Sequence, residues 1–212
     1  PIITQTKEVK NQIDSIYSQG IWDDYKKITN PYEYIFLSLS RRMSRSVATR
    51  TPLSRSYFKM LELWIGAGLS EEIDILVKRD GGLISTHAAE GPGGFIEALH
   101  NLYENNVKYS QGMTLRSTSR TIPGWRKTTL FLHRHPTIHI SYGEDGTGDL
   151  LNIENLDYFV HNLKEKSHIY TADGGFDFSS DFNAQEETIL PLLTAEFYLG
   201  LKSIQRGGAL IV

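Results

Sequence analysis

The sequence contains no cysteine, no apolar run long enough to cross a bilayer, and no excess of basic residues. Without cysteine the chain forms neither disulfides nor thiolate zinc sites, which agrees with a reducing compartment. The net charge of −3 gives no overall attraction to nucleic acid, so any RNA contact has to come from a local basic surface. We therefore expect a cytoplasmic protein without a membrane segment.

With 212 residues, 40% of them hydrophobic, the chain can bury one sizeable core. We expect a single domain over 1–212, made of a helical N-terminal extension at 1–50 and a core at 51–212. The chain starts without Met and ends inside the apolar run 209–212. We therefore expect an excerpt of a longer polypeptide, truncated at its C-terminus, from which the last strands of the domain are missing.

The most informative stretch is Ser85 to Leu99, where a glycine-rich segment separates a short apolar run from apolar residues at helical spacing. This order predicts a strand, a tight turn and a helix. Gly91, Gly93 and Gly94 have no Cβ, so the backbone can bend sharply and lie against a ligand, and Pro92 stiffens the turn. We expect free N–H groups at the start of the helix to attract a carboxylate or phosphate.

The turn by itself is compatible with a cofactor site or with a tight turn that binds nothing. The dinucleotide fingerprint requires the spacing G-x-G-x-x-G, which residues 90–95 do not have. Dinucleotide-binding folds also use an acidic residue at the second strand to bind the ribose. Residues 113–116, which occupy this place in the predicted strand, contain no acid. A dinucleotide-dependent oxidoreductase is therefore disfavoured.

Helical and extended patterns alternate along the chain. Helical spacing occurs at 7–25, 34–39, 54–65, 153–163 and 183–204, and extended patterns occur at 112–116, 129–141, 168–172 and 209–212. The alternation predicts an α/β fold with an open, mainly parallel sheet and helices on both faces. Ligands bind at the carboxyl ends of the strands in such sheets, where the Gly91 turn and Asp173 would lie.

Two patterns resemble metal sites but lack required features. His133, His135 and His139 would share one face of a strand at 129–141, yet Pro136 interrupts the run and no acidic partners accompany the histidines. The acidic loop 142–149 lacks the glycine and glutamate that an EF-hand needs at its sixth and twelfth positions. We expect no metal site.

The run Glu90-Gly91-Pro92-Gly93-Gly94-Phe95-Ile96-Glu97 resembles the S-adenosylmethionine-binding turn of FtsJ-like RNA 2′-O-methyltransferases. Two further stretches follow that family's order: 54–60 resembles the segment with a catalytic lysine, and 172–176 resembles the motif with the catalytic aspartate. The resemblance implies a Rossmann-like methyltransferase fold, with Lys59 and Asp173 as catalytic residues. It also implies that S-adenosylmethionine contacts Glu90 to Phe95, Asp149 and Asp173.

The cap-methylating branch of the family fits best, because 30–33, 142–146 and 183–186 resemble its additions. The resemblance implies capped mRNA as the substrate, and the divergence elsewhere indicates a viral homologue from a large cytoplasmic DNA virus. Basic side chains neutralise phosphates and exposed aromatic rings stack on bases. For these roles we select Arg45, Arg50, Trp125, Arg126 and Asn183; the alternatives are a solvated helix face for the arginines and packing at the core edge for Trp125.

Two departures from the family pattern support a second interpretation. His87 occupies a position that is often aspartate, and the family's second catalytic lysine and its glutamate would come after Val212. The alternative function is a methyltransferase fold that has lost its chemistry and binds RNA or a protein partner. No feature of the sequence predicts an oligomeric state.

Overall fold

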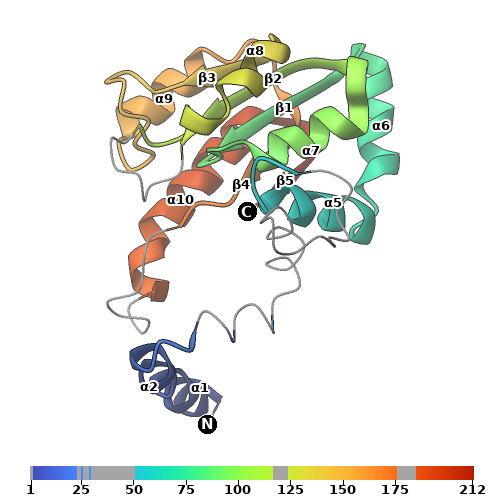
Figure 1. Cartoon of the computed structure of the whole chain (residues 1–212). Helices are drawn as coiled ribbons and strands as arrows, with labels where there is room; N and C mark the ends of the chain where they lie inside the picture. The colour runs from blue at the N-terminus through green and yellow to red at the C-terminus, as the bar shows by residue number, and fades with distance from the viewer. Residues whose placement is uncertain (1, 23–24, 26–28, 30–50, 117–123, 176–184) are drawn as a thin grey trace. The chain divides into compact units, whose positions relative to one another are not determined.

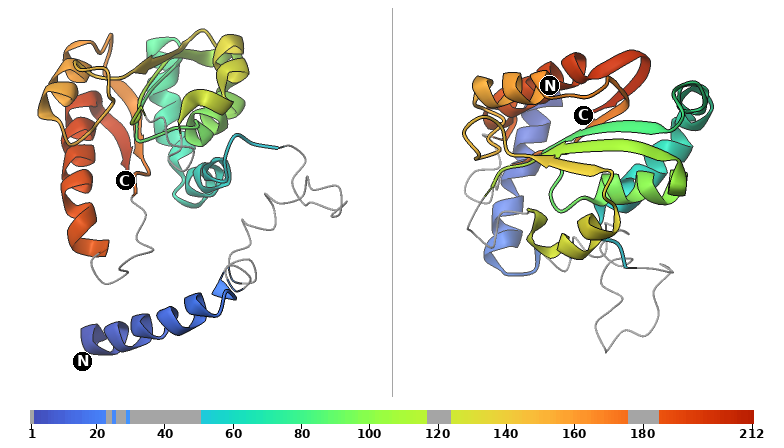
Figure 2. Two further views of the ribbon diagram at one scale, coloured as in Figure 1. Left: turned by 60° about the vertical axis from the view of Figure 1, so that its left-hand side comes forward. Right: turned by 90° about the horizontal axis from the view of Figure 1, so that it is seen from above.

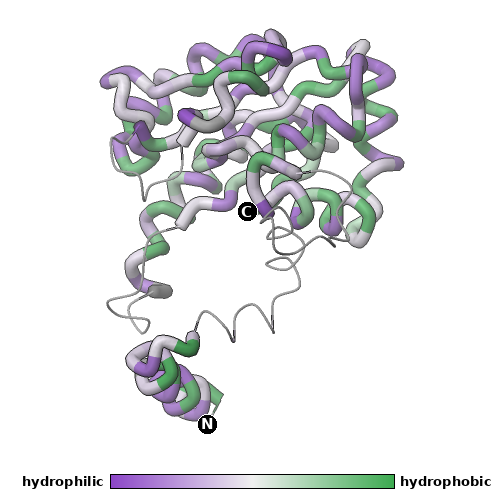
Figure 3. Tube along the Cα trace, viewed as in Figure 1, coloured by the Kyte–Doolittle hydropathy of each residue, from purple (hydrophilic) through white to green (hydrophobic). Residues whose placement is uncertain are grey.

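The computed structural model describes residues 2–22, 25, 29, 51–116, 124–175 and 185–212. The chain divides into two compact units, residues Pro1–Thr51 with Phe176–Ile189 and residues Pro52–Gly175 with Leu190–Val212. In the first unit, α1 (Ile2–Asn11) and α2 (Ile13–Ser18) replace the single helix expected at 7–25. No residue of α1 is buried, and Figure 3 shows hydrophobic as well as hydrophilic residues along this helix. The helix predicted at 34–39 lies outside the described residues.

The second unit is built on a sheet of five described strands in the order β3-β2-β1-β4-β5, and every neighbouring pair is parallel (Figure 1). The strands are β1 (Leu83–Ala88), β2 (Val107–Met113), β3 (Ile138–Ser141), β4 (Ser167–Ala172) and β5 (Ile204–Ile211). All residues of β1 and β4 are buried, as expected for parallel strands that are covered on both faces. The predicted α/β architecture is confirmed.

Helices cover both faces of the sheet, as Figure 2 shows. On one face, α5 (Ser56–Gly66), α6 (Leu69–Asp80) and α7 (Gly94–Tyr103) pack around Leu83, Val107 and Ile169. On the other, α9 (Ile153–His161) and α10 (Gln185–Ser203) pack around Ala88 and Tyr170. Successive strand residues point to opposite faces, which is why the two cores share strands.

Several element boundaries differ from the sequence expectations. The strand expected at 129–141 is wrong: α8 (Thr129–Arg134) comes first, and only 138–141 is a strand, so His133 and His135 are not on it. Two short 3₁₀ helices lie at Glu104–Asn106 and Trp125–Lys127. Strand β2 begins and ends earlier than the expected 112–116. Among the described helices, none combines the length and apolar character that crossing a membrane requires.

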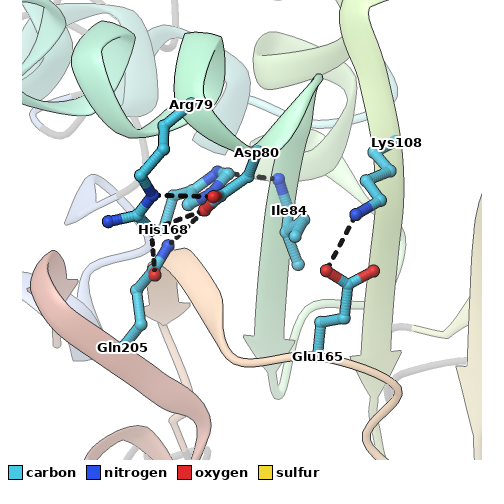
Figure 4. Close-up of polar contacts among 7 residues, drawn as sticks. All are labelled: Arg79, Asp80, Ile84, Lys108, Glu165, His168 and Gln205. Carbon is cyan, nitrogen blue, oxygen red and sulfur yellow. Dashed lines mark hydrogen bonds and ion pairs between the residues drawn. The ribbon is translucent and has the colours of Figure 1, made fainter.

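His168 joins three elements at the amino ends of the central strands (Figure 4). The fully buried ring accepts the Ile84 N–H at Nδ1 over 3.0 Å, and its Nε2 bonds Asp80 at the end of α6 over 2.9 Å. Asp80 also accepts bonds from Arg79 and Gln205, and the Arg79 guanidinium, followed by His168, holds the Asp80 pKa below its usual value. The strand registers shift here, between Leu83 and Ile84 and again beside His168. The imidazole therefore satisfies a backbone N–H beside the shift in register.

Replacing His168 by leucine should lower the free energy of unfolding by roughly 1 to 3 kcal/mol, because a buried N–H loses its acceptor. Urea denaturation at neutral pH measures the change. Lys108→Ala is the control, since it breaks a Lys108–Glu165 pair whose side chains are 39% and 45% exposed. We expect a loss below about 1 kcal/mol there. Equal losses in the two variants would contradict this role of His168.

Candidate active site

Lys59 and Asp173, the two residues predicted to be catalytic, form an ion pair. Lys59 lies on α5, and Asp173 follows the last residue of β4. The Lys59 ammonium donates to both carboxylate oxygens, at 2.8 and 3.0 Å, and the side chains are 43% and 41% exposed. Residues 114 positions apart in sequence are thus paired at a solvent-accessible position beyond the carboxyl end of β4.

The glycine turn after β1 positions the start of α5. Gly94 is buried, and a Cβ there would clash with the hydroxyls of Ser54 and Ser56 and lie 2.9 Å from the Tyr57 nitrogen. The Leu53 N–H donates to a Glu97 carboxylate oxygen of α7 over 2.7 Å. The segment 54–60, predicted to contain the catalytic lysine, and the glycine turn therefore pack directly on each other. This contact holds the helix that carries Lys59.

Glu90 occupies the N-terminus of α7. Its buried carboxyl accepts the N–H groups of Phe95, at 2.7 Å, and of Ile96, at 3.4 Å. Our expectation of free N–H groups for an external carboxylate or phosphate is wrong at these two positions, because the chain supplies the acceptor itself. Burial raises the Glu90 pKa to about 8, with the negative charge of Asp173 acting in the same direction.

A second buried acid, Glu196 of α10, was not predicted. Its carboxyl accepts the Gly174 N–H over 3.1 Å, directly after Asp173. Burial, against the effect of the Gly174 hydrogen bond and with the help of the Asp173 charge, raises the pKa of Glu196 to about 7. The signal in the sequence was an acid on the apolar face of a helix, four residues after Leu192 and three before Leu199.

His87 is a buried strand residue whose ring bonds Thr171 at Nδ1 over 2.7 Å and Ser85 at Nε2 over 2.8 Å. Burial, followed by the nearby His100, lowers its pKa to about 3, so the ring is neutral. The same chain of contacts continues from Ser85 to the hydroxyl of Ser110. At this position the chain thus has a hydrogen-bonded side chain inside the sheet in place of an aspartate.

The loop after β3 contains the predicted cofactor residue Asp149. Asp149 Oδ1 accepts the Leu151 N–H over 2.9 Å, and Asp145 accepts the hydroxyl and N–H of Thr147, which lower its pKa to about 2. Gly148 passes so close to the Thr114 carbonyl that a side chain would clash. The loop is therefore fixed beside the carboxyl end of β2, on the same edge as the glycine turn.

Trp125 is not an exposed stacking platform, so that expectation is wrong. The ring is 7% exposed and lies against Gly93 and Gly112 and in a small core with Ile96. The two glycines leave room for the ring, and its burial agrees with the alternative, packing at the core edge. Arg126, the next residue, has an exposed side chain. Arg45, Arg50 and Asn183 lie outside the described residues.

The residues at this edge suit a small cationic ligand better than a phosphate. Glu90, Asp173 and Glu196 gather beyond β1 and β4, and the α7 N-terminus already has its acceptor. Of these three groups, Asp173 is the partly exposed carboxylate, and an exposed carboxylate attracts an ammonium or a sulfonium. In the described part of the chain, no group of three or more His, Asp or Glu side chains is arranged to hold a metal ion.

The pKa of Glu90 predicts a pH dependence of stability. The folded protein retains a proton that the unfolded side chain, with a pKa of 4.5, releases, so stability falls as the pH rises from 4.5 to about 8. Glu90→Gln keeps the acceptor oxygen but does not titrate. Over this pH range its free energy of unfolding should therefore rise relative to that of the unaltered protein. The gain approaches about 1.4 kcal/mol per unit of pKa shift.

Urea unfolding at about pH 5, 7 and 9 measures this difference. Glu72→Gln, at an exposed position of α6, is the matched control and should show no such trend. A stability difference between Glu90→Gln and the unaltered protein that is the same at every pH would contradict the prediction.

No protein-family model matches the chain. Its sequence is similar to cap-specific mRNA (nucleoside-2′-O-)-methyltransferase 2 of Danio rerio, with 26% identity over 213 residues, covering 97% of this chain and 27% of the relative. The "Probable methyltransferase EP424R" of African swine fever virus (isolate Warthog/Namibia/Wart80/1980) is 38% identical over 136 residues, 58% of this chain and 32% of the relative. The chain spans 27% to 44% of the length of the first curated relatives it matches.

A solved structure from Plasmodium falciparum, described as a ribosomal RNA methyltransferase, has a similar fold. The TM-score is 0.50 at 13% identity, over 75% of this chain and 76% of the other. The comparisons confirm the expected resemblance. The chain is similar in sequence to cap-specific mRNA 2′-O-methyltransferases, has a viral relative, and adopts the Rossmann-like methyltransferase fold.

Proposed function

We propose that the protein is an S-adenosylmethionine-dependent RNA 2′-O-methyltransferase that acts on the cap-proximal ribose of mRNA. The observation that carries the proposal is the Lys59–Asp173 pair, which lies where β4 ends in a Rossmann-like sheet. In such sheets the carboxyl edge is where ligands bind. The similarity to cap-specific methyltransferases supports mRNA as the substrate.

The ammonium and sulfonium groups of S-adenosylmethionine are both positive, and Asp173 is the partly exposed carboxylate at this edge that would attract them. We assign the cofactor to the backbone of Gly91, Gly93 and Gly94, to Asp173, and to Asp149 for the ribose or adenine. When bound, the cofactor supplies an activated methyl group, so that a C–O bond forms, an S–CH₃ bond breaks and S-adenosylhomocysteine is released. Glu90 stabilises the glycine turn from inside the protein, through its hydrogen bonds with the Phe95 and Ile96 N–H groups.

Lys59 would orient the ribose 2′-hydroxyl and receive its proton, because a free hydroxyl is a weak nucleophile. An amine accepts a proton only when it is itself neutral, so the Lys59 ammonium would first release one proton to solvent, and the Asp173 carboxylate would stabilise the ammonium that forms again when the hydroxyl proton is received. Asp173 holds the Lys59 nitrogen in place through two hydrogen bonds. For the RNA strand we retain Arg126, with Arg45, Arg50 and Asn183 as further proposed contacts.

Binding of labelled S-adenosylmethionine to the longest natural form of the polypeptide is the direct test. We expect binding, followed by methyl transfer to capped RNA and no transfer to the same RNA already methylated at the cap-proximal 2′-oxygen. Binding without transfer to either RNA would exclude the proposed reaction. The absence of binding would indicate a fold that has kept the glycine turn without its cofactor.

Lys59→Ala should lower kcat by about a hundredfold or more, because the transfer loses the group that receives the proton. Cofactor affinity should stay within about threefold, since the variant retains the turn and the acids around it. Lys108→Ala, which removes another partly exposed, ion-paired lysine, should transfer methyl groups at the unaltered rate. Unchanged transfer by Lys59→Ala would refute the assignment.

A further inference from the structure

Glu196 is an acid in an apolar setting. It is 3% exposed on α10, and the buried side chains of Leu192, Ala195 and Leu199 lie on the same helix face. Burying a carboxyl group is costly unless a hydrogen bond compensates. Within the described residues the hydrogen-bond partner of Glu196 is the Gly174 N–H. The position of this acid is therefore tied to the backbone beside Asp173.

That backbone lies beyond the paired part of the sheet. The last paired residue of β4 toward β1 is Ala172, so Asp173 and Gly174 follow without partners in that ladder. Gly174 is closely packed, because a Cβ there would clash with Glu196 Oε1 and lie 3.0 Å from Ala89 Cβ. The Glu196 carboxyl and the end of β1 together fix the peptide that follows Asp173.

We propose that Glu196 is a positioning residue for methyl transfer, which by accepting the Gly174 N–H sets the direction in which Asp173 presents its carboxylate to Lys59. The catalytic part of this inference rests on the proposed function. The link is short, because Gly174, which donates the hydrogen bond, directly follows Asp173, which forms the ion pair. Glu196 itself does not contact Lys59 in any described hydrogen bond.

The role requires an acceptor oxygen and not a negative charge. A protonated carboxyl and an amide both keep a carbonyl oxygen that accepts an N–H. Among the described residues, the carboxylate of Asp173 and the buried hydroxyl group of Tyr170 interact electrostatically with Glu196. Glu196→Gln therefore preserves the proposed function of the residue, and Glu196→Leu removes it while filling a similar volume.

The experiment compares Glu196→Leu, Glu196→Gln and the control Glu187→Leu, which changes an exposed acid of the same helix. In the longest natural form of the protein, kcat for capped RNA should fall at least about tenfold in Glu196→Leu, with KM and cofactor affinity within about threefold. Glu196→Gln and Glu187→Leu should stay close to the unaltered rate. Thermal unfolding shows that each variant is folded at the assay temperature.

A second measurement does not depend on activity. An amine-acylating reagent, followed by peptide mass spectrometry, gives the labelling rate of Lys59, which should rise several-fold in Glu196→Leu as the pair with Asp173 loosens. Unaltered labelling in Glu196→Leu, or equal loss of kcat in the leucine and glutamine variants, would overturn the positioning role. If the unaltered protein transfers no methyl group, the proposed function fails, whereas the labelling result still decides whether Glu196 positions the pair.

Discussion

The candidate site depends on two places where backbone meets neighbouring groups with no room for a side chain. At Gly94 the first turn of α7 lies against the start of α5, and at Gly174 the chain after β4 lies against Ala89 and Glu196. The first contact sets where Lys59 begins its helix, and the second sets where Asp173 points. A Cβ at Gly94 would lie 2.9 Å from the Tyr57 nitrogen of α5, and a Cβ at Gly174 would meet Glu196 Oε1, so that the carboxyl would have to shift.

The electrostatics of this edge follow from burial. Glu90 and Glu196 are pushed toward their neutral forms because they lie inside the protein and near Asp173. Asp173 and Lys59 remain partly exposed and ion-paired, so the charge of the site is concentrated at the surface. The interior acids act mainly as acceptors for backbone N–H groups, one at the start of α7 and one after β4.

Local patterns in the sequence were sufficient for much of the fold. The helix α9 and the strand β4 have clear apolar periodicity, and glycines mark the turn between β1 and α7. The alternation of helical and extended patterns predicts a parallel sheet. The choice of Lys59 and Asp173 as catalytic residues came from family motifs and not from spacing, and their ion pair is a finding of the structure. Contacts between distant segments were not predictable in the same way. Glu196 gains a function only when α10 packs beside Gly174, and Trp125 is buried because two glycines leave space for its ring.

The hydrogen bonds of His87 restrict which atoms donate and which accept inside the sheet. A neutral imidazole has one donor and one acceptor, so if Nε2 carries the proton, Thr171 must donate to Nδ1, and if Nδ1 carries it, Ser85 must donate to Nε2. Ser85 in turn meets Ser110, which bonds the ring of His100 on α7. If Ser85 donates to His87, Ser110 must donate to Ser85, and the Nε2 atom of His100 must then donate to Ser110. The tautomer of His87 with the proton on Nδ1 therefore fixes the tautomer of His100 as well.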